Sequence, residues 1–117
     1  MRFLKYKFSR TISYSRRKGV KCDLDLEYFL YLYDIQQGKC FYTDMEMTCC
    51  AGKGIMRSAL SIDRIIPENG YTKGNVVLCC NIINMSKTNL TLEEIEKWMP
   101  SWYIRITNWL NICISEP

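Results

Sequence analysis

The chain has 117 residues, of which 48% are apolar and 24% charged, a composition that suits one globular domain and excludes a disordered or collagen-like chain. Its longest unbroken apolar run, residues 28–33, is too short to cross a bilayer, so we expect no membrane span. The net charge of +4 is unevenly distributed and points to an anionic partner for one end of the chain.

Residues 1–21 hold eight of the sixteen Lys and Arg residues and none of the twelve acids, which leaves the other 96 residues with a net charge of −4. We interpret this segment as a basic N-terminal arm that binds nucleic-acid phosphates, with aromatic residues between the charges available for stacking. A solubilising terminus whose aromatic residues pack on the body is the alternative. The charges also break up any secretory signal, although a transit peptide fits the same composition. The cations are Arg2, Lys5, Lys7, Arg10, Arg16, Arg17, Lys18 and Lys21.

A first helix is predicted from a cap at Asp23 or Asp25 to about Gln37, and Gly38 ends it. Its apolar residues recur at the spacing of one helical face, which we expect to face the core. That stripe consists of Leu26, Phe29, Leu30 and Tyr33. The following residues, 39–54, have no periodicity and read as a loop.

Residues 59–66 alternate apolar and polar side chains as a half-buried strand does, and residues 75–80 form a second apolar strand. Between them, Pro67, Asn69-Gly70 and Gly74 indicate a turn. Helical spacing follows from about residue 80 to 87, and Thr91 with Glu94 predicts a capping box for the next helix.

Pro100 ends that helix, and a last helix is expected to start at Ser101. Its apolar residues should cover the core rather than line a ligand site. They are Trp102, Ile106, Trp109, Leu110 and Cys113. We see no internal repeat and no flexible linker other than the arm.

The strand–turn–strand–helix unit is expected to bring Asp63, near the end of its first strand, beside Asn84 on its helix. One carboxylate and one amide oxygen make an open set of oxygen ligands that suits Mg²⁺ or Mn²⁺. Spacing alone carries little weight for this pair, since many sequences place an Asp and an Asn this far apart.

The stretch as a whole resembles the HNH endonucleases, a ββα-metal family that includes endonuclease VII-like enzymes. Their core commonly reads D-H-I-x-P, a glycine pair, then N-[LV]-x-x-L-C-x-x-C-N-x-x-K, and this chain reads "DRIIP", Gly70, then "NVVLCCNIINMSK" over residues 75–87. Together with "IQQGKC", "CFYTD" and "LTLEEI", the pattern is similar to small HNH-like proteins of phages and large viruses. The resemblance covers roughly residues 23–98.

The resemblance implies an α+β fold with a ββα-metal core, made of a two-stranded hairpin and a short helix, flanked by one N-terminal and two C-terminal helices. It implies that Asp63 and Asn84 hold a catalytic Mg²⁺ or Mn²⁺. It also implies that Asn75 ties the loop to the strand through backbone hydrogen bonds, a task that suits an amide because it both donates and accepts.

Arg64 stands where the family has its proton-accepting histidine, and the chain contains no histidine. A guanidinium stays protonated and cannot act as a base, but it can bind the scissile phosphate. Metal-bound hydroxide, a substrate phosphate oxygen or Glu68 would then have to accept the proton. Alternatively, Arg64 is a phosphate anchor or ion-pair partner in a disused site.

Many relatives also hold zinc with two C-x-x-C pairs, whereas the matching positions here are Cys40 with Thr43 and Cys80 with Ile83. Because threonine and isoleucine are not zinc ligands in such sites, we expect no structural zinc there. We interpret the seven cysteines as reduced thiols rather than a disulfide framework, with a rearranged cluster of Cys49, Cys50 and Cys79 as the alternative.

The sequence therefore predicts a basic arm over residues 1–21 and one HNH-like domain over 22–117, acting as a metal-dependent DNA endonuclease. Lys87 and the arm would add electrostatic grip on DNA, with RNA as the alternative partner, and no membrane is involved. We expect an intracellular location: the host cytoplasm or nucleus, or the virion, if the source is viral. The competing hypothesis is an inactive HNH-fold protein that binds nucleic acid or forms part of a virion. The sequence does not indicate the oligomeric state.

Overall fold

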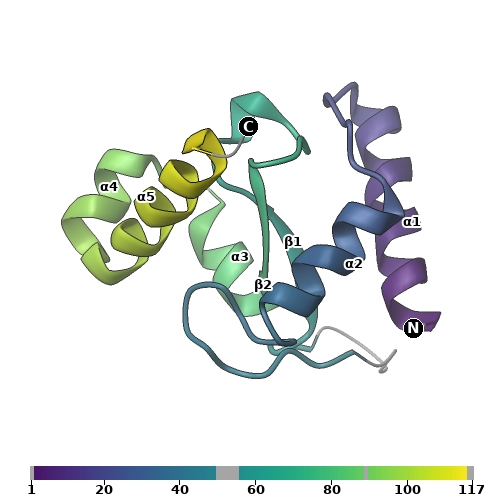
Figure 1. Cartoon of the computed structure of the whole chain (residues 1–117), viewed down its shortest axis with the longest axis horizontal. Helices are drawn as coiled ribbons and strands as arrows, with labels where there is room; N and C mark the ends of the chain where they lie inside the picture. The colour runs from purple at the N-terminus through teal and green to yellow at the C-terminus, as the bar shows by residue number, and fades with distance from the viewer. Residues whose placement is uncertain (1, 50–55, 89, 116–117) are drawn as a thin grey trace.

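The computed structural model describes residues 2–49, 56–88 and 90–115. It is a mixed α+β arrangement in which α1 and α2 lie on one side of a two-stranded hairpin and α4 and α5 on the other (Figure 1). This confirms the predicted class. The elements are α1 (Arg2–Lys18), α2 (Leu26–Ile35), β1 (Leu60–Arg64), the 3-10 turn η1 (Pro67–Asn69), β2 (Val76–Cys80), α3 (Asn81–Lys87), α4 (Leu92–Trp98) and α5 (Pro100–Ser115).

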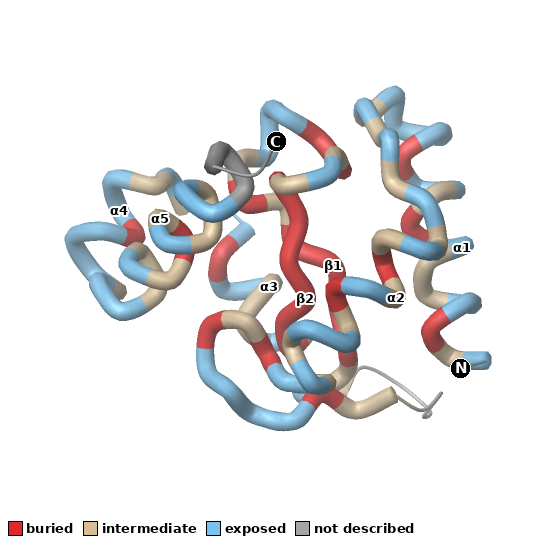
Figure 2. The backbone as a smooth tube through the Cα atoms, viewed as in Figure 1, coloured by how far each residue is buried: buried red, intermediate tan, exposed pale blue. Residues whose placement is uncertain are grey.

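The hairpin is the centre of the core. Its strands pair antiparallel, from Leu60 opposite Cys80 to Arg64 opposite Val76. Every residue of β2 is buried, as Figure 2 shows by its continuous red trace. The prediction of a half-buried β1 is wrong, because Ser61 and Asp63 are buried as well as their apolar neighbours. The hairpin is thus covered on both faces, and the polar residues of β1 need partners inside the protein.

Helix α2 begins at its predicted cap, where the Asp25 carboxylate accepts a hydrogen bond of 2.8 Å from the backbone N–H of Tyr28. It ends before Gly38, whose φ of +69° lies in the left-handed region that favours glycine. The buried positions are Phe29 and Leu32, so the core-facing stripe is rotated relative to the one predicted. Leu26, Leu30 and Tyr33 are only partly buried at its margin.

The N-terminal segment is a helix packed on the body, where the sequence predicted a basic arm and, as the alternative, a terminus whose aromatic residues pack on the body. Leu4 is buried in the core, and the Phe8 ring lies 5.7 Å from the Phe29 ring of α2. Thr11 and Ser15 are buried on the same helix, with their hydroxyls bonded to backbone carbonyls one turn back. These small side chains allow a close approach while interrupting the apolar pattern, which is why periodicity alone did not reveal the helix.

The C-terminal helices pack against each other beside the hairpin. The predicted capping box of α4 is confirmed, since Thr91 and Glu94 exchange two hydrogen bonds of 3.1 Å. Ile106 of α5 is fully buried, and the Trp109 indole N–H donates to the Gly74 carbonyl at 3.1 Å. The side chain of Cys113 lies outside the described residues. No helix in the described part of the chain is long and apolar enough to span a membrane.

Candidate functional site

The turn from β2 into α3 brings Asn84 next to β1, as the sequence predicts. Asn84 Nδ2 donates to Ser61 Oγ at 2.6 Å and to the Ile62 carbonyl at 3.3 Å. Asn84 and Asp63 line one cavity of about 190 Å³, which we call the Asp63 cavity. Its other lining residues include Arg64, Lys87, Tyr14 and Tyr71. The predicted convergence of positions 63 and 84 on one cavity is therefore present.

Asp63 itself is not the open ligand that the sequence suggests, because its side chain is enclosed and engaged at both oxygens. The residue is 3% exposed, Oδ1 lies 3.1 Å from Lys87 Nζ, and Oδ2 accepts a hydrogen bond of 2.5 Å from the Tyr42 hydroxyl. Burial raises the pKa of Asp63, although Lys87 and Tyr42 act in the opposite direction. Burial also raises the pKa of Tyr42 strongly, so its hydroxyl remains a donor.

Lys87 was predicted to bind nucleic acid electrostatically, but the structure buries it inside the protein. The residue is only 4% exposed, and its ammonium group donates to Asp63 and, at 3.2 Å, to the Arg64 carbonyl. The same group lies 5.9 Å from the centre of the Tyr42 ring. Lys87 therefore positions the Asp63 carboxylate and neutralises its charge. It also lines the Asp63 cavity, where a bound ligand could contact it.

Arg64 is half-buried at the end of β1 and lines the cavity beside Asp63. Its guanidinium lies 5.0 Å from the centre of the Tyr71 ring, a cation–π contact that holds it over the aromatic face. Glu68, the alternative proton acceptor, is exposed on η1 and lines a neighbouring groove with Leu90 and Thr91 instead. Of the residues of η1, Pro67 lines the Asp63 cavity and Glu68 does not.

Asn75 makes the backbone hydrogen bonds that the resemblance implied. Its Nδ2 donates to the carbonyls of Ile66 and Gly70 at 2.9 and 2.7 Å, while its Oδ1 accepts from the Ile66 N–H at 3.0 Å. The Asn75 amide thus ties the start of β2 to the turn that follows β1. It holds the turn from the inside and does not line the Asp63 cavity.

Two of the predicted N-terminal cations reach the site. Lys7 and Arg10 line a second cavity of about 240 Å³, the α1 cavity, together with Thr11, Tyr14, Ser61, Ile62, Tyr71 and Asn84. The two cavities adjoin, because Tyr14, Ile62, Tyr71 and Asn84 belong to both. Burial, followed by the nearby Arg10, lowers the pKa of Lys7. The other predicted cations line neither cavity; they are Arg2, Lys5, Arg16, Arg17, Lys18 and Lys21.

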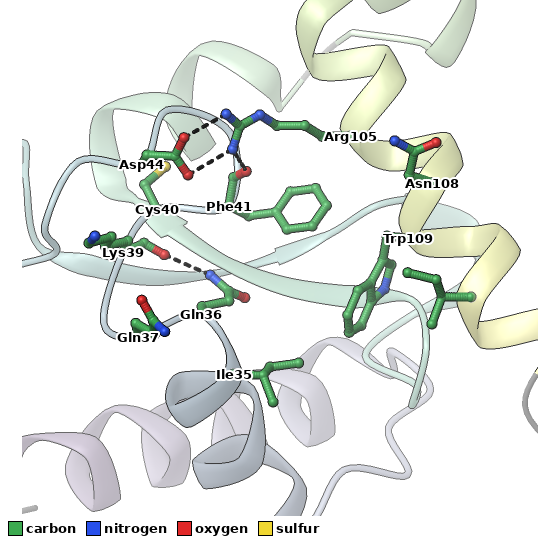
Figure 3. A pocket seen from close by; sticks show the side chains of 11 residues that line it. Ile35, Gln36, Gln37, Lys39, Cys40, Phe41, Asp44, Arg105, Asn108 and Trp109 are labelled. Atoms are coloured by element: carbon green, nitrogen blue, oxygen red, sulfur yellow. Dashed lines mark hydrogen bonds and ion pairs between the residues drawn. The ribbon is translucent and has the colours of Figure 1, made fainter.

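The largest cavity described, about 700 Å³, lies elsewhere, between the end of α2, the following loop and α5 (Figure 3). Arg105 there forms two hydrogen bonds with the Asp44 carboxylate, at 2.9 and 2.7 Å, and a third with the Phe41 carbonyl. The Gln36 amide donates a hydrogen bond to the Leu78 carbonyl of β2 and accepts one from the Leu78 N–H. These polar groups bond to other parts of the protein. Arg105 connects α5 to the loop, and Gln36 connects the end of α2 to the edge of the sheet.

The cysteines are placed by the hairpin and the loop before it. Cys40, Cys79 and Cys80 are buried, and Cys49 contacts the Tyr33 hydroxyl at 3.7 Å. Cys50, a member of the alternative cluster, lies outside the described residues. Within residues 2–49, 56–88 and 90–115, no three His, Cys, Asp or Glu side chains are grouped so that they could hold a metal ion.

The donor set at the Asp63 cavity fits a divalent cation only as part of a larger complex. A carboxylate has about four lone-pair positions, of which Tyr42 and Lys87 use two. Both hydrogen bonds that the Asn84 side chain makes with described residues run through Nδ2, and none of them uses the lone pairs of its Oδ1. Because Lys87 already balances the charge of Asp63, a substrate phosphate and waters would have to complete the coordination, as is usual for Mg²⁺.

No protein-family model, curated protein or solved structure matches this chain. The chemistry of the site must therefore be argued from its own geometry.

Proposed function

We propose that this chain is an HNH-like, metal-dependent endonuclease that hydrolyses phosphodiester bonds in DNA, with a hairpin and α3 serving as its ββα-metal core. One observation carries the proposal: Asp63, Asn84 and Arg64 line a single polar cavity that continues into another lined by Lys7 and Arg10. Oxygen donors and cations that line two adjoining cavities match the two needs of a bound phosphodiester, a metal and charge neutralisation.

The chain's own residues have separate tasks in this proposal. Asp63 and Asn84 would hold Mg²⁺ or Mn²⁺, which when bound supplies Lewis-acid stabilisation of charge on the phosphate. Arg64 binds a non-bridging phosphate oxygen, and its cation–π contact with Tyr71, another lining residue, restrains the guanidinium. Tyr42 and Lys87 fix the rotamer of Asp63. Asn75 keeps the turn that carries Tyr71 closed.

Among the described residues that line the Asp63 cavity, no side chain is placed to accept a proton from the attacking water. Asp63 accepts hydrogen bonds at both oxygens, and Arg64 remains protonated. A phosphate oxygen of the substrate is the acceptor that this arrangement leaves, which predicts a slow reaction relative to an enzyme with a positioned base, since general base catalysis contributes roughly 10²- to 10⁴-fold.

The same observations favour a second candidate, a protein that binds nucleic acid without cutting it. The ion pair between Lys87 and Asp63 satisfies the carboxylate without any metal, at 3.1 Å and with both side chains buried. In that case Arg64 and the α1 cations would bind phosphates, and Asp63 would be purely structural.

Plasmid nicking in Mg²⁺ and in Mn²⁺ separates the candidates. We expect wild-type protein to nick supercoiled DNA, and Asn84→Ala to abolish nicking while retaining DNA binding and the circular dichroism spectrum. Asp63→Asn with Lys87→Met removes the carboxylate without leaving a buried, unpaired ammonium group, and should likewise abolish nicking. Glu93→Gln, at an exposed residue of α4, is the matched control and should cut like wild type. Wild-type protein that binds DNA but never nicks it with either metal would establish the second candidate.

A further inference from the structure

We propose that the outer face of α1 binds a single, unpaired nucleic-acid strand and leads it into the Asp63 cavity. This inference rests on the proposed function and specifies its substrate class. The face consists of Tyr6, Arg10, Tyr14 and Arg17, which we call the α1 outer face. Steps of four, four and three residues place these side chains along one side of an α-helix on successive turns.

Aromatic rings and cations alternate along this face. The Arg10 guanidinium lies 6.0 Å from the Tyr6 ring centre, and the Arg17 guanidinium lies 5.9 Å from that of Tyr14. Both tyrosines are solvent-accessible residues, Tyr6 at 56% and Tyr14 at 36%. Rings that accept stacked bases, next to cations that pair with phosphates, are the two components of surfaces that bind single strands.

The α1 outer face is continuous with the proposed site. Arg10 and Tyr14 line the α1 cavity, and Tyr14 also lines the Asp63 cavity. The Tyr14 ring contacts the Tyr71 ring edge to face, with centres 6.4 Å apart, and Tyr71 in turn carries Arg64 on its face. A strand on α1 would therefore meet an unbroken series of rings and guanidinium groups up to Asp63.

An unpaired strand suits this surface better than a duplex does. Bases inside a duplex are stacked on each other, and proteins read them there through hydrogen bonds to base edges in the grooves. The exposed tyrosine rings of α1 can stack only on bases that are already unstacked from their neighbours. A duplex would use the cations alone, and any cation on the helix would then serve about equally well.

Exposed cations on a flank of α1, between the outer face and the buried face, offer a matched comparison. Lys5 and Arg16 are exposed cations of the same helix, but helical geometry turns them away from Lys7 and Arg10, and neither lines the two cavities. Tyr31 of α2 is likewise an exposed tyrosine, at 49%, outside both cavities. These residues control for charge and for aromatic content.

The test is fluorescence anisotropy with the full chain in EDTA, using labelled 12-nucleotide single-stranded DNA, single-stranded RNA of the same sequence, and the corresponding DNA duplex. We expect a single strand to bind more tightly than the duplex, and the two single strands identify the preferred sugar. Tyr6→Leu with Tyr14→Leu should weaken single-strand binding roughly tenfold or more while changing duplex binding little. Tyr31→Leu should bind like wild type.

The cation variants provide an independent measurement. Arg10→Gln with Arg17→Gln should weaken single-strand binding and lower the slope of log affinity against log salt by about 1 for each lost phosphate contact. Lys5→Gln with Arg16→Gln removes the same charge and should change the slope less. Equal losses for both pairs, a preference for duplex, or unchanged binding of the tyrosine variants would overturn the inference.

Failure of this inference can be distinguished from failure of the proposed function. Binding is measured without metal, so a protein that never nicks DNA can still show the single-strand preference. Conversely, if the protein nicks duplex plasmids but the α1 tyrosine variants bind single strands like wild type, the proposed function stands and the single-strand inference fails. Tyr6→Leu alone tests the same point without disturbing the contact between Tyr14 and Tyr71.

Discussion

The Arg64 side chain lies beside Asp63 in the cavity but carries a permanent positive charge, so it cannot take a proton from an attacking water. A histidine at this position would place an imidazole in the same cavity wall. Its reference pKa of about 6.5 lies in the range where a base is effective at neutral pH.

We predict that Arg64→His cleaves DNA faster than wild type, in Mg²⁺ or Mn²⁺, with a rate that increases as the pH rises from about 5.5 to 7.5. The neutral imidazole is the active form, so the rate should level off above its pKa. Single-turnover nicking at a series of pH values measures this. Arg64→Gln, which has neither charge nor base, is the control, and an Arg64→His rate no higher than wild type would rule out a missing base as the limiting feature.

At the same scale, Lys87 is a buried ammonium whose charge is matched by Asp63. Lys87→Met keeps most of the side-chain volume and leaves the carboxylate buried without its cation. We expect a loss of about 3–5 kcal/mol in the free energy of unfolding at neutral pH, the range found when one partner of a buried ion pair is removed.

This loss should depend on pH in a defined direction. Burial raises the pKa of Asp63 in the folded protein, and removing Lys87 takes away its largest opposing influence. A carboxyl group with a raised folded pKa stabilises the fold below its unfolded pKa and loses that contribution as the pH rises through the folded value. In urea unfolding, the stability of Lys87→Met relative to wild type should therefore increase as the pH is lowered from 7 towards 4.

Two further variants control this prediction. Asp63→Asn with Lys87→Met removes both charges and should show a smaller loss with little pH dependence. Lys97→Met removes an exposed cation of α4 and should be nearly neutral. A Lys87→Met protein as stable as wild type at pH 7 would contradict the buried ion pair.

At the scale of elements, the connection between the strands depends on Gly70. Its φ of +71° and ψ of −165° lie in a region that is essentially restricted to glycine. A Cβ at this position would approach the Lys21 carbonyl oxygen to 2.4 Å, where the segment before α2 accepts a hydrogen bond from the Tyr71 N–H. The hairpin turn and the segment linking α1 to α2 therefore meet at a place with no room for a side chain.

We predict that Gly70→Ala destabilises the protein by more than Gly19→Ala does. Gly19 has a similar φ of +66° but nothing within 4 Å of an added Cβ, so its variant reports the backbone strain alone, about 1–3 kcal/mol. The excess loss in Gly70→Ala measures the close approach to Lys21 together with the strain of its glycine-restricted ψ of −165°. Urea midpoints provide the comparison, and equal losses would mean that the approach relaxes without cost.

Sequence patterns located most of the elements because their signals are local. The capping box at Thr91 and Glu94, the cap at Asp25 and the turn glycines each act within a few residues, and the structure places helices and turns there. The partners of Asp63 were not predictable in the same way. Tyr42 comes from a loop without periodicity, and Lys87 was visible only as a charge, so their convergence depends on tertiary packing.

At the scale of the whole molecule, the basic N-terminal segment is part of the packed fold. Residues 1–21 carry eight cations and no acids, yet α1 packs through Leu4 and Phe8 on a body of opposite net charge. One face of α1 is thus part of the core, and the cations of its other faces remain available to solvent.

The packing of α1 therefore predicts that the domain cannot lose this helix without losing stability. Leu4→Ala should reduce the free energy of unfolding by about 2–5 kcal/mol, because Leu4 is buried in the common core and its truncation leaves a cavity. Tyr6→Ala, two residues away on the exposed face, should change stability by less than about 0.5 kcal/mol. Urea unfolding followed by circular dichroism tests both. If residues 1–21 were a detached arm, Leu4→Ala would be as neutral as Tyr6→Ala, and the single-strand path along α1 would lose the rigid support that links it to the Asp63 cavity.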